Sequence, residues 1–367
     1  MSARLGVVFW LGSLVWLPAQ EDLGPLLEPL RQQYGVPALG AAVLVDGELH
    51  ALGAVGVRRR GHEAAVTVDD RWHLGSCTKA MTATLLARQV EAGKVAWTTT
   101  LAEALPDLAD RLHAGARGIT LAQLLQHRAG LPAQPPDALW GELFRFAGTD
   151  AEARTEVATA MLAVAPEAAP GTRFLYSNAS YMLAGAISER LGGSEWNTLV
   201  AAQLFTPLGI TSAGFGPPGT DDATDQPWGH RPQPKGPVAV FADNPPSLGP
   251  AGTVHMALRD WARFAALHLG VVPVVDGKPL LQPDTLRALH TPPEGADYAL
   301  GWRVARRDWA PGPILTHAGS NTMWFCVAWL APEARFGVLV TCNQGDAAAA
   351  CDAVAAACIA RYRPAAR

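Results

Sequence analysis

The chain has 367 residues, of which 49% are hydrophobic and 17% are charged, a balance typical of a globular protein rather than a disordered one. The formal net charge is −4 and no long basic run is present, so the composition argues against a nucleic-acid-binding protein. This length allows a large core and favours two lobes.

The N-terminus has the pattern of a secretory signal peptide. Arg4 supplies a positive start, 5–17 is apolar and uncharged, and Ala19 offers a small residue for cleavage. The apolar run is short for a membrane span. We therefore predict a signal peptide over about 1–19, a periplasmic or secreted protein, and no stable membrane span after cleavage. Leu17 is larger than ideal at the cleavage site, so an uncleaved anchor stays open.

Hydrophobic periodicity and turn signals predict the elements in chain order. The first half is expected to hold a helix over 23–34 and strands over 40–45 and 48–57 joined by the turn pair Asp46-Gly47. The segment 69–74 leads into a helix from Ser76 to about Gly93, and further helices are expected over 119–126, 155–163 and 179–191. A Pro- and Gly-rich stretch over 207–251 predicts a long functional or disordered loop. The second half is expected to hold helices over 253–269 and 283–289, strands over 298–306, 314–317, 323–330 and 336–342, and a closing helix over 346–362.

This order predicts an α+β fold, because strands lie at both ends of the chain and helices lie between them. We expect an antiparallel sheet flanked by the terminal helices, with an inserted, mostly helical lobe. The sheet lobe would be discontinuous and comprise 20–75 and 295–367, the helical lobe would comprise 76–294, and both would belong to one domain of about 26–360.

The five cysteines are an odd number, so at least one thiol should be free unless it links to another chain. Cys77 is the expected free one. Cys326 and Cys342 lie on predicted adjacent strands, and Cys351 and Cys358 lie on one face of the last predicted helix. Disulfides among these four and buried free thiols both stay possible.

Ser76-Cys77-Thr78-Lys79 is the most informative stretch, because a lysine three residues after a serine on a helix shares its face and can reach its hydroxyl. A serine is a weak nucleophile until a neighbouring base takes its proton. The chain has 25 Arg and only four Lys. Arginine cannot act as a base in a protein, whereas a partly buried lysine can. Alone, the motif could still be a coincidence on an amphipathic helix.

Two further segments could complete a site around Ser76. Tyr176-Ser177-Asn178 precedes a predicted helix; a tyrosine near a lysine can act as a general base, and an asparagine amide can bind a substrate amide. His317-Ala318-Gly319-Ser320 ends a predicted strand, where the glycine lets a substrate lie close to the strand edge. A packing tyrosine followed by a helix-capping asparagine is the alternative for the first segment.

The three ordered motifs resemble those of the penicillin-recognising serine hydrolases, in the branch that holds class C β-lactamases, D-alanyl-D-alanine carboxypeptidases, D-aminopeptidases and related esterases. The similarity runs from about Leu26 to the C-terminus and includes the surrounding segments 124–132, 170–174 and 250–252. It implies a β-lactamase/transpeptidase-like fold and acyl transfer without a metal or organic cofactor. The partner would be a small-molecule or peptide substrate with a reactive carbonyl, in an amide, lactam or ester.

The resemblance also implies roles for seven residues. Ser76 would be the nucleophile, and Lys79 and Tyr176 would share its proton. The substrate-binding residues would be Asn178, His317, Gly319 and Ser320, with the backbone N–H groups of Ser76 and Ser320 forming the oxyanion hole. A histidine at position 127, in the loop before Gly130, is expected to be structural.

The third motif departs from the Lys-Thr-Gly of the lactamases, because His317 is mostly neutral near pH 7 and Ala318 has no hydroxyl. Both differences weaken recognition of a substrate carboxylate. A peptidase or amidase of the D-alanyl-D-alanine carboxypeptidase or β-lactamase-like kind is the leading hypothesis. The alternatives are a carboxylesterase of the same fold, supported by Ala318 and by Trp324 if it is not a core residue, and a non-catalytic penicillin-binding-type protein.

Overall fold

The computed structural model describes residues 20–364 of the chain. The predicted signal segment, 1–19, therefore lies outside the described residues. Among the residues that are described, the helices are too short or too polar to cross a membrane.

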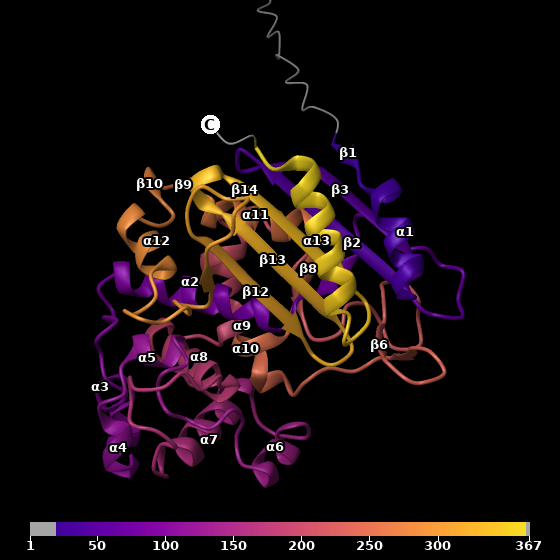
Figure 1. Ribbon diagram of the computed structural model, residues 1–367. Coiled ribbons are helices and arrows are strands. Elements are labelled where there is room, and N and C mark those ends of the chain that lie inside the picture. Colours follow the sequence, from indigo (N-terminus) through magenta and orange to yellow (C-terminus); the bar gives the residue numbers. More distant parts are fainter. Residues whose placement is uncertain (1–19, 365–367) are drawn as a thin grey trace, which may run out of the picture.

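A seven-stranded sheet takes its strands from the two ends of the described chain (Figure 1). Their order across the sheet is β1–β3–β2–β14–β13–β12–β11, and neighbours run antiparallel except β1 and β3. The strands are β1 (Glu21–Asp22), β2 (Ala38–Val45), β3 (Glu48–Gly56), β11 (Arg303–Ala305), β12 (Ile314–Ser320), β13 (Phe325–Ala331) and β14 (Phe336–Cys342). The central pair, β2 and β14, joins segments from opposite ends of the sequence.

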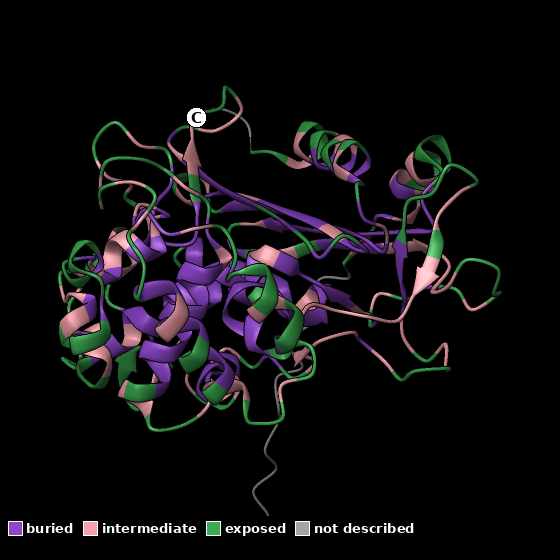
Figure 2. Ribbon diagram, turned by 90° about the horizontal axis from the view of Figure 1, so that it is seen from below, coloured by how far each residue is buried: buried purple, intermediate pink, exposed green. Residues whose placement is uncertain are grey.

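Helices cover both faces of the sheet. Helices α1 (Gly24–Tyr34) and α13 (Ala348–Tyr362) pack on one face, and α11 (Leu258–His268) packs on the other, against β2, β3 and β14. Figure 2 shows the sheet as a buried layer between the two terminal helices and the larger helical part. Because both faces are covered, β2 and β14 are apolar along almost their whole length rather than alternating with polar residues.

Most of the remaining helices form the larger part below the sheet in Figure 1, with α8 at its centre in contact with α2, α5, α7 and α10, whereas α12 lies beside the sheet. The α-helices are α2 (Thr78–Glu91), α3 (Leu101–Ala104), α4 (Ala114–Arg117), α5 (Leu121–Leu125), α6 (Asp137–Leu143), α7 (Asp150–Leu162), α8 (Asn178–Gly192), α9 (Trp196–Val200), α10 (Gly249–Gly252) and α12 (Pro283–His290). Short 3-10 or π turns are η1 (Gly75–Cys77), η2 (Pro106–Arg111), η3 (Ala201–Phe205), η4 (Pro246–Leu248) and η5 (Pro332–Ala334). The division into two lobes at 75/76 and 294/295 stays a prediction.

Small sheets lie outside the main one. A three-stranded sheet has the order β4–β8–β5, with β4 (Arg71–His73), β8 (Val254–Ala257) and β5 (Gly214–Phe215). Two-stranded ribbons pair β6 (Gly229–Arg231) with β7 (Val238–Val240), and β9 (Val274–Val275) with β10 (Lys278–Pro279). The segment 207–251 thus contains short strands and turns and is not one continuous loop.

Two expected elements are wrong in part. The helix predicted over 253–269 begins at Leu258, because Val254–Ala257 is β8, paired on both sides. The strand predicted over 298–306 is reduced to β11, because Gly301 adopts a positive φ of 82° and lies against the backbone of Ala80 in α2. Hydrophobic periodicity could reveal neither the strands that pair with β8 nor the contact between Gly301 and α2.

Candidate active site

Ser76 lies in the turn η1, directly before helix α2. The strand β4 leads into this turn, and the N–H of Leu74 donates to the carbonyl of Val254 in β8, 2.8 Å away. Gly75 has a positive φ of 45°, a conformation that glycine adopts without steric cost. The small sheet and this glycine therefore fix the serine at the N-terminal end of α2, where it is partly exposed to solvent.

Lys79 is buried on the first turn of α2, and its ammonium group contacts three oxygens. Its Nζ lies 3.0 Å from Ser76 Oγ and 2.8 Å from both Asn178 Oδ1 and the carbonyl oxygen of Ala251. The side chain is 0% exposed. Burial, which disfavours the charged form, lowers the pKa of Lys79 from 10.5 to about 7. The lysine is therefore poised between its charged and neutral forms near neutral pH.

Tyr176 reaches Ser76 from the loop that precedes α8. Its hydroxyl donates to Ser76 Oγ at 2.8 Å. Ser177 caps α8, accepting from the N–H of Ser180 and donating to the carbonyl of Pro132, so the loop enters the helix in a fixed orientation. Tyr176 is 37% exposed overall, but the surrounding protein desolvates its hydroxyl and raises its pKa above the ordinary value, although the hydrogen bond to Ser76 acts in the opposite direction. The phenol is therefore neutral at physiological pH.

His127 holds this loop in place. Its Nδ1 accepts the N–H of Ser177 at 3.1 Å, and its ring lies 4.3 Å from the Tyr176 ring, centroid to centroid. Burial lowers the pKa of His127 well below its ordinary value, so the imidazole is neutral and can accept this bond. The geometry is that of a structural histidine.

The third motif lies on β12 against the turn that carries Ser76. A Cβ on Gly319 would overlap the carbonyl oxygen of Leu74, and a Cβ on Gly75 would overlap the backbone nitrogen of Ser320. The two glycines thus let the strand and the turn approach closely enough for the Ser76 and Ser320 backbones to lie side by side. The structure brings Ser76, Lys79, Tyr176, Asn178, Gly319 and Ser320 together; their catalytic roles stay predictions.

His317 differs from the other predicted site residues, because its side chain is buried and both ring nitrogens have partners. Nδ1 donates to the carbonyl of Ala318 at 2.7 Å, which leaves Nε2 to accept the hydroxyl of Tyr298 at 2.8 Å. The neighbouring Ala318 is exposed instead. The third motif therefore presents a methyl group and backbone atoms to solvent, while the His317 ring is engaged in the interior.

A buried polar network behind Ser76 was not predicted from the sequence. His73 Nδ1 accepts the N–H of Gly75 at 3.1 Å, and its Nε2 lies 2.6 Å from Asp243 Oδ2. Asp243 also accepts from the side-chain amide of Asn321, in the loop just after Ser320. One carboxylate of the 207–251 segment therefore links the strand before Ser76 to the loop after Ser320. The length of that segment was the only sequence signal that it takes part in the site.

Trp324 is a core residue, contrary to the possibility that it lines a substrate pocket. It is 2% exposed and packs edge-to-face on Trp72, with ring centroids 6.2 Å apart. Its position in the sequence, just beyond the third motif, did not reveal this packing.

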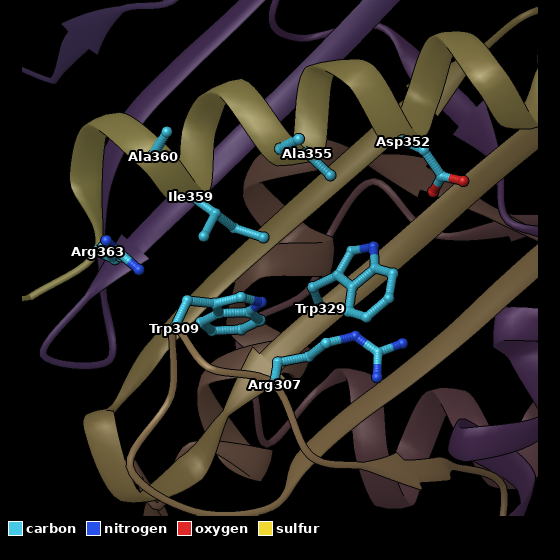
Figure 3. Close-up of a pocket in the computed structure, with 9 residues that line it drawn as sticks. Arg307, Trp309, Trp329, Asp352, Ala355, Ile359, Ala360 and Arg363 are labelled. Carbon is cyan, nitrogen blue, oxygen red and sulfur yellow. The ribbon is translucent and has the colours of Figure 1, made fainter.

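A cavity of about 430 Å³ lies elsewhere, between α13 and the side of the sheet that faces away from the larger helical part. Figure 3 shows Trp309 and Trp329 on one side of it and Ala355 and Ile359 of α13 on the other. It has no residue in common with the cluster around Ser76.

Known proteins match nearly the whole described chain. A family model described as beta-lactamase matches residues 24–360. Penicillin-binding protein 4 of Amycolatopsis lactamdurans is 30% identical over 344 residues, which cover 87% of this chain and 84% of that protein. The D-alanyl-D-alanine-carboxypeptidase/endopeptidase AmpH of Escherichia coli K12 is 29% identical over 188 residues, which cover 50% of this chain and 47% of the relative.

Solved structures agree on the fold. A class C beta lactamase from Rhodobacter sphaeroides superposes with a TM-score of 0.72 at 21% identity, covering 92% of this chain and 97% of that one. A beta-lactamase/D-alanine carboxypeptidase from Pseudomonas syringae gives 0.74 at 20% identity, covering 94% and 99%. The predicted α+β fold and the resemblance drawn from the motifs are both confirmed. The chain belongs to the beta-lactamase family.

Proposed function

We propose that this protein is an exported serine hydrolase that forms a covalent acyl-enzyme on Ser76. The observation that carries the proposal is the contact of Ser76 Oγ with two proton-exchanging groups, Lys79 Nζ at 3.0 Å and Tyr176 Oη at 2.8 Å. A hydroxyl held between an amine and a phenol has a base to take its proton and a donor to return it. Export rests on the apolar, uncharged run over 5–17 after Arg4.

Lys79 is the better candidate for the base. Its lowered pKa makes the neutral amine abundant near pH 7, whereas the raised pKa of Tyr176 keeps the phenol protonated. Lys79 would accept the Ser76 proton as Oγ attacks the substrate carbonyl. Tyr176 would then donate its own proton to the leaving group and be reprotonated from Lys79, and water would hydrolyse the acyl-enzyme.

The developing oxyanion would be stabilised by the backbone N–H groups of Ser76 and Ser320. Asn178 would orient the substrate through its NH₂ group, since its Oδ1 already accepts from Lys79. Donors placed in this way are often worth several kcal/mol of transition-state stabilisation.

The leading substrate class is a D-amino-acid peptide or another amide. The relative AmpH, a D-alanyl-D-alanine-carboxypeptidase/endopeptidase, supports the peptide. A carboxylesterase is the second candidate, and a specific observation favours it. Both nitrogens of His317 are engaged by Tyr298 and Ala318, so this ring has no free N–H for a substrate carboxylate. An ester substrate would not need one.

Replacing Ser76 by alanine tests the nucleophile. A fluorescent fluorophosphonate should label the parent and leave Ser76→Ala labelled to about 1% or less, because the attacking oxygen is gone. Ser194→Ala, at an exposed serine away from the site, is the matched control and should label like the parent. Equal labelling of parent and Ser76→Ala would reject Ser76 as the nucleophile.

Replacing Gly75 by alanine tests the oxyanion hole. The new Cβ would overlap the Ser320 nitrogen, so we expect acylation to slow by about 100-fold with the fold retained by circular dichroism. Gly118→Ala is the control, because a Cβ there meets nothing within 4 Å. Parent-like acylation of Gly75→Ala would show that the close approach of the two backbones is not needed.

The pH dependence tests the base. Only neutral Lys79 can accept a proton, and its fraction rises with pH, so kcat/KM should climb about tenfold per pH unit below about 7 and level off above it. Lys79→Arg should be inactive throughout, because arginine keeps its proton. A parent profile that is flat across this range would contradict the assignment.

A side-by-side assay decides the substrate class. We expect turnover of a D-Ala-D-Ala peptide. Its carboxylate and that of nitrocefin should both be held weakly, because Ala318 brings no hydroxyl to the third motif, so both substrates should show a high KM. Turnover of p-nitrophenyl butyrate alone would replace the peptidase with the esterase. A Ser76 adduct with penicillin that forms without turnover of any of the three would favour the non-catalytic, penicillin-binding alternative.

A further inference from the structure

Two buried thiols meet directly beside Ser76. Cys77, the next residue, lies in η1, and Cys326 lies on β13, 249 positions away in the sequence. Their sulfur atoms are 3.5 Å apart. The sequence offered no reason to pair them, since Cys77 was expected to be the free thiol.

Cys326 and Cys342 illustrate why the pairing could not be guessed from predicted strands. They lie on adjacent strands but belong to the two separate cores on opposite faces of the sheet. Their side chains therefore point apart, which rules out a disulfide between them in this fold. Cys326 instead faces the turn that carries Cys77.

The two thiols hold the backbone on both sides of the site. Cys77 Sγ donates to the carbonyl of His317 at 3.4 Å, and Cys326 Sγ donates to the carbonyl of Leu74 at 3.1 Å. The Cys77 thiol thus connects the turn η1 to β12, and the Cys326 thiol connects β13 to the residue before η1. Cys326 also lies opposite Gly319 in the β12–β13 register.

The environments of the two thiols differ. Burial acts to raise the pKa of Cys77, but its contacts with Cys326 and His317 and the charge of nearby Lys79 bring it below its ordinary value. Burial and the Cys77 sulfur raise the pKa of Cys326. Buried thiols are ordinarily inert. The lowered pKa makes the Cys77 thiol easier to deprotonate than the Cys326 thiol, and its neighbour Ser76 is partly exposed, so a small oxidant would react first at Cys77.

We propose that Cys77 and Cys326 are a redox-active pair that a hydroperoxide converts into a disulfide, and that this disulfide slows the acylation of Ser76. The second clause rests on the proposed hydrolase function. In the first step Cys77 attacks a peroxide oxygen and becomes a sulfenic acid, releasing water from hydrogen peroxide. In the second step the Cys326 sulfur attacks the sulfenic sulfur, the S–S bond forms and a second water leaves. Two thiols lose two protons and two electrons, and the peroxide is reduced.

The disulfide would disturb the site for a geometric reason. An S–S bond is about 2.05 Å long, so the sulfurs must approach by roughly 1.5 Å. Both S–H donors to the Leu74 and His317 carbonyls are lost in the process. The backbones at Gly75 and Gly319 already touch the opposite segment, so they cannot absorb this movement without shifting the Ser76 or Ser320 N–H. A misplacement of about 1 Å can cost about 100-fold in rate.

The test compares the full chain after treatment with hydrogen peroxide and after reduction with dithiothreitol. Intact mass and peptide mapping should find a loss of about 2 Da and a linked Cys77–Cys326 peptide pair. Fluorophosphonate labelling of Ser76 should slow at least tenfold in the oxidised protein and recover on reduction.

Two variants make the test specific. Cys326→Ser keeps a hydroxyl donor toward Leu74 but cannot form the bond, so peroxide should leave its labelling rate unchanged. Cys342→Ser, at an equally buried thiol on the other face, should respond like the parent.

Each outcome bears on one clause of the proposal. Absence of the linked peptides, or a stable sulfinic acid on Cys77 instead, overturns the redox pair. Linked peptides with an unchanged labelling rate overturn the effect on Ser76. A reduced parent that is never labelled overturns the proposed hydrolase function and the second clause with it, while the peptide map still judges the pairing.

Discussion

The site depends on one buried amine and the three oxygens around it. Lys79 Nζ contacts a side chain three residues away, one 99 residues away and a backbone carbonyl 172 residues away. A charged amine out of water costs several kcal/mol unless polar partners surround it. The three oxygens offset enough of this cost for the protonated form of Lys79 to persist, and burial lowers its pKa so that the proton is readily given up. Helices α2, α8 and α10 pack on one another around this point.

Much of this arrangement could be predicted from the sequence. The Ser76/Lys79 spacing, the Tyr176-Ser177-Asn178 loop and the strand end at His317 each carry a local signature, and turn and periodicity signals located most helices and strands. The α+β fold followed from the order of those elements, because strands at both termini must meet to bury their apolar faces.

What could not be predicted depends on which distant residues meet. No spacing links His73 to Asp243, and only the structure reveals that one carboxylate supports both segments beside Ser76. The direction of the His317 ring depends on Tyr298, nineteen residues away on a segment that was expected to be a strand. The strand at 254–257 could not be predicted because its partners, β4 and β5, are very short segments from other parts of the chain.

The order of the sheet has a consequence for how the chain acquires its structure during synthesis. The strand β2 is made early, but its neighbour β14 begins only at Phe336, after almost three hundred intervening residues. At ribosomal speeds of about 5–20 residues per second, the early strand waits for tens of seconds without this central partner. The sheet closes only when the last strand has left the ribosome. The nascent polypeptide therefore stays open through most of translation, the condition in which chaperones can hold it and a translocation channel can thread it.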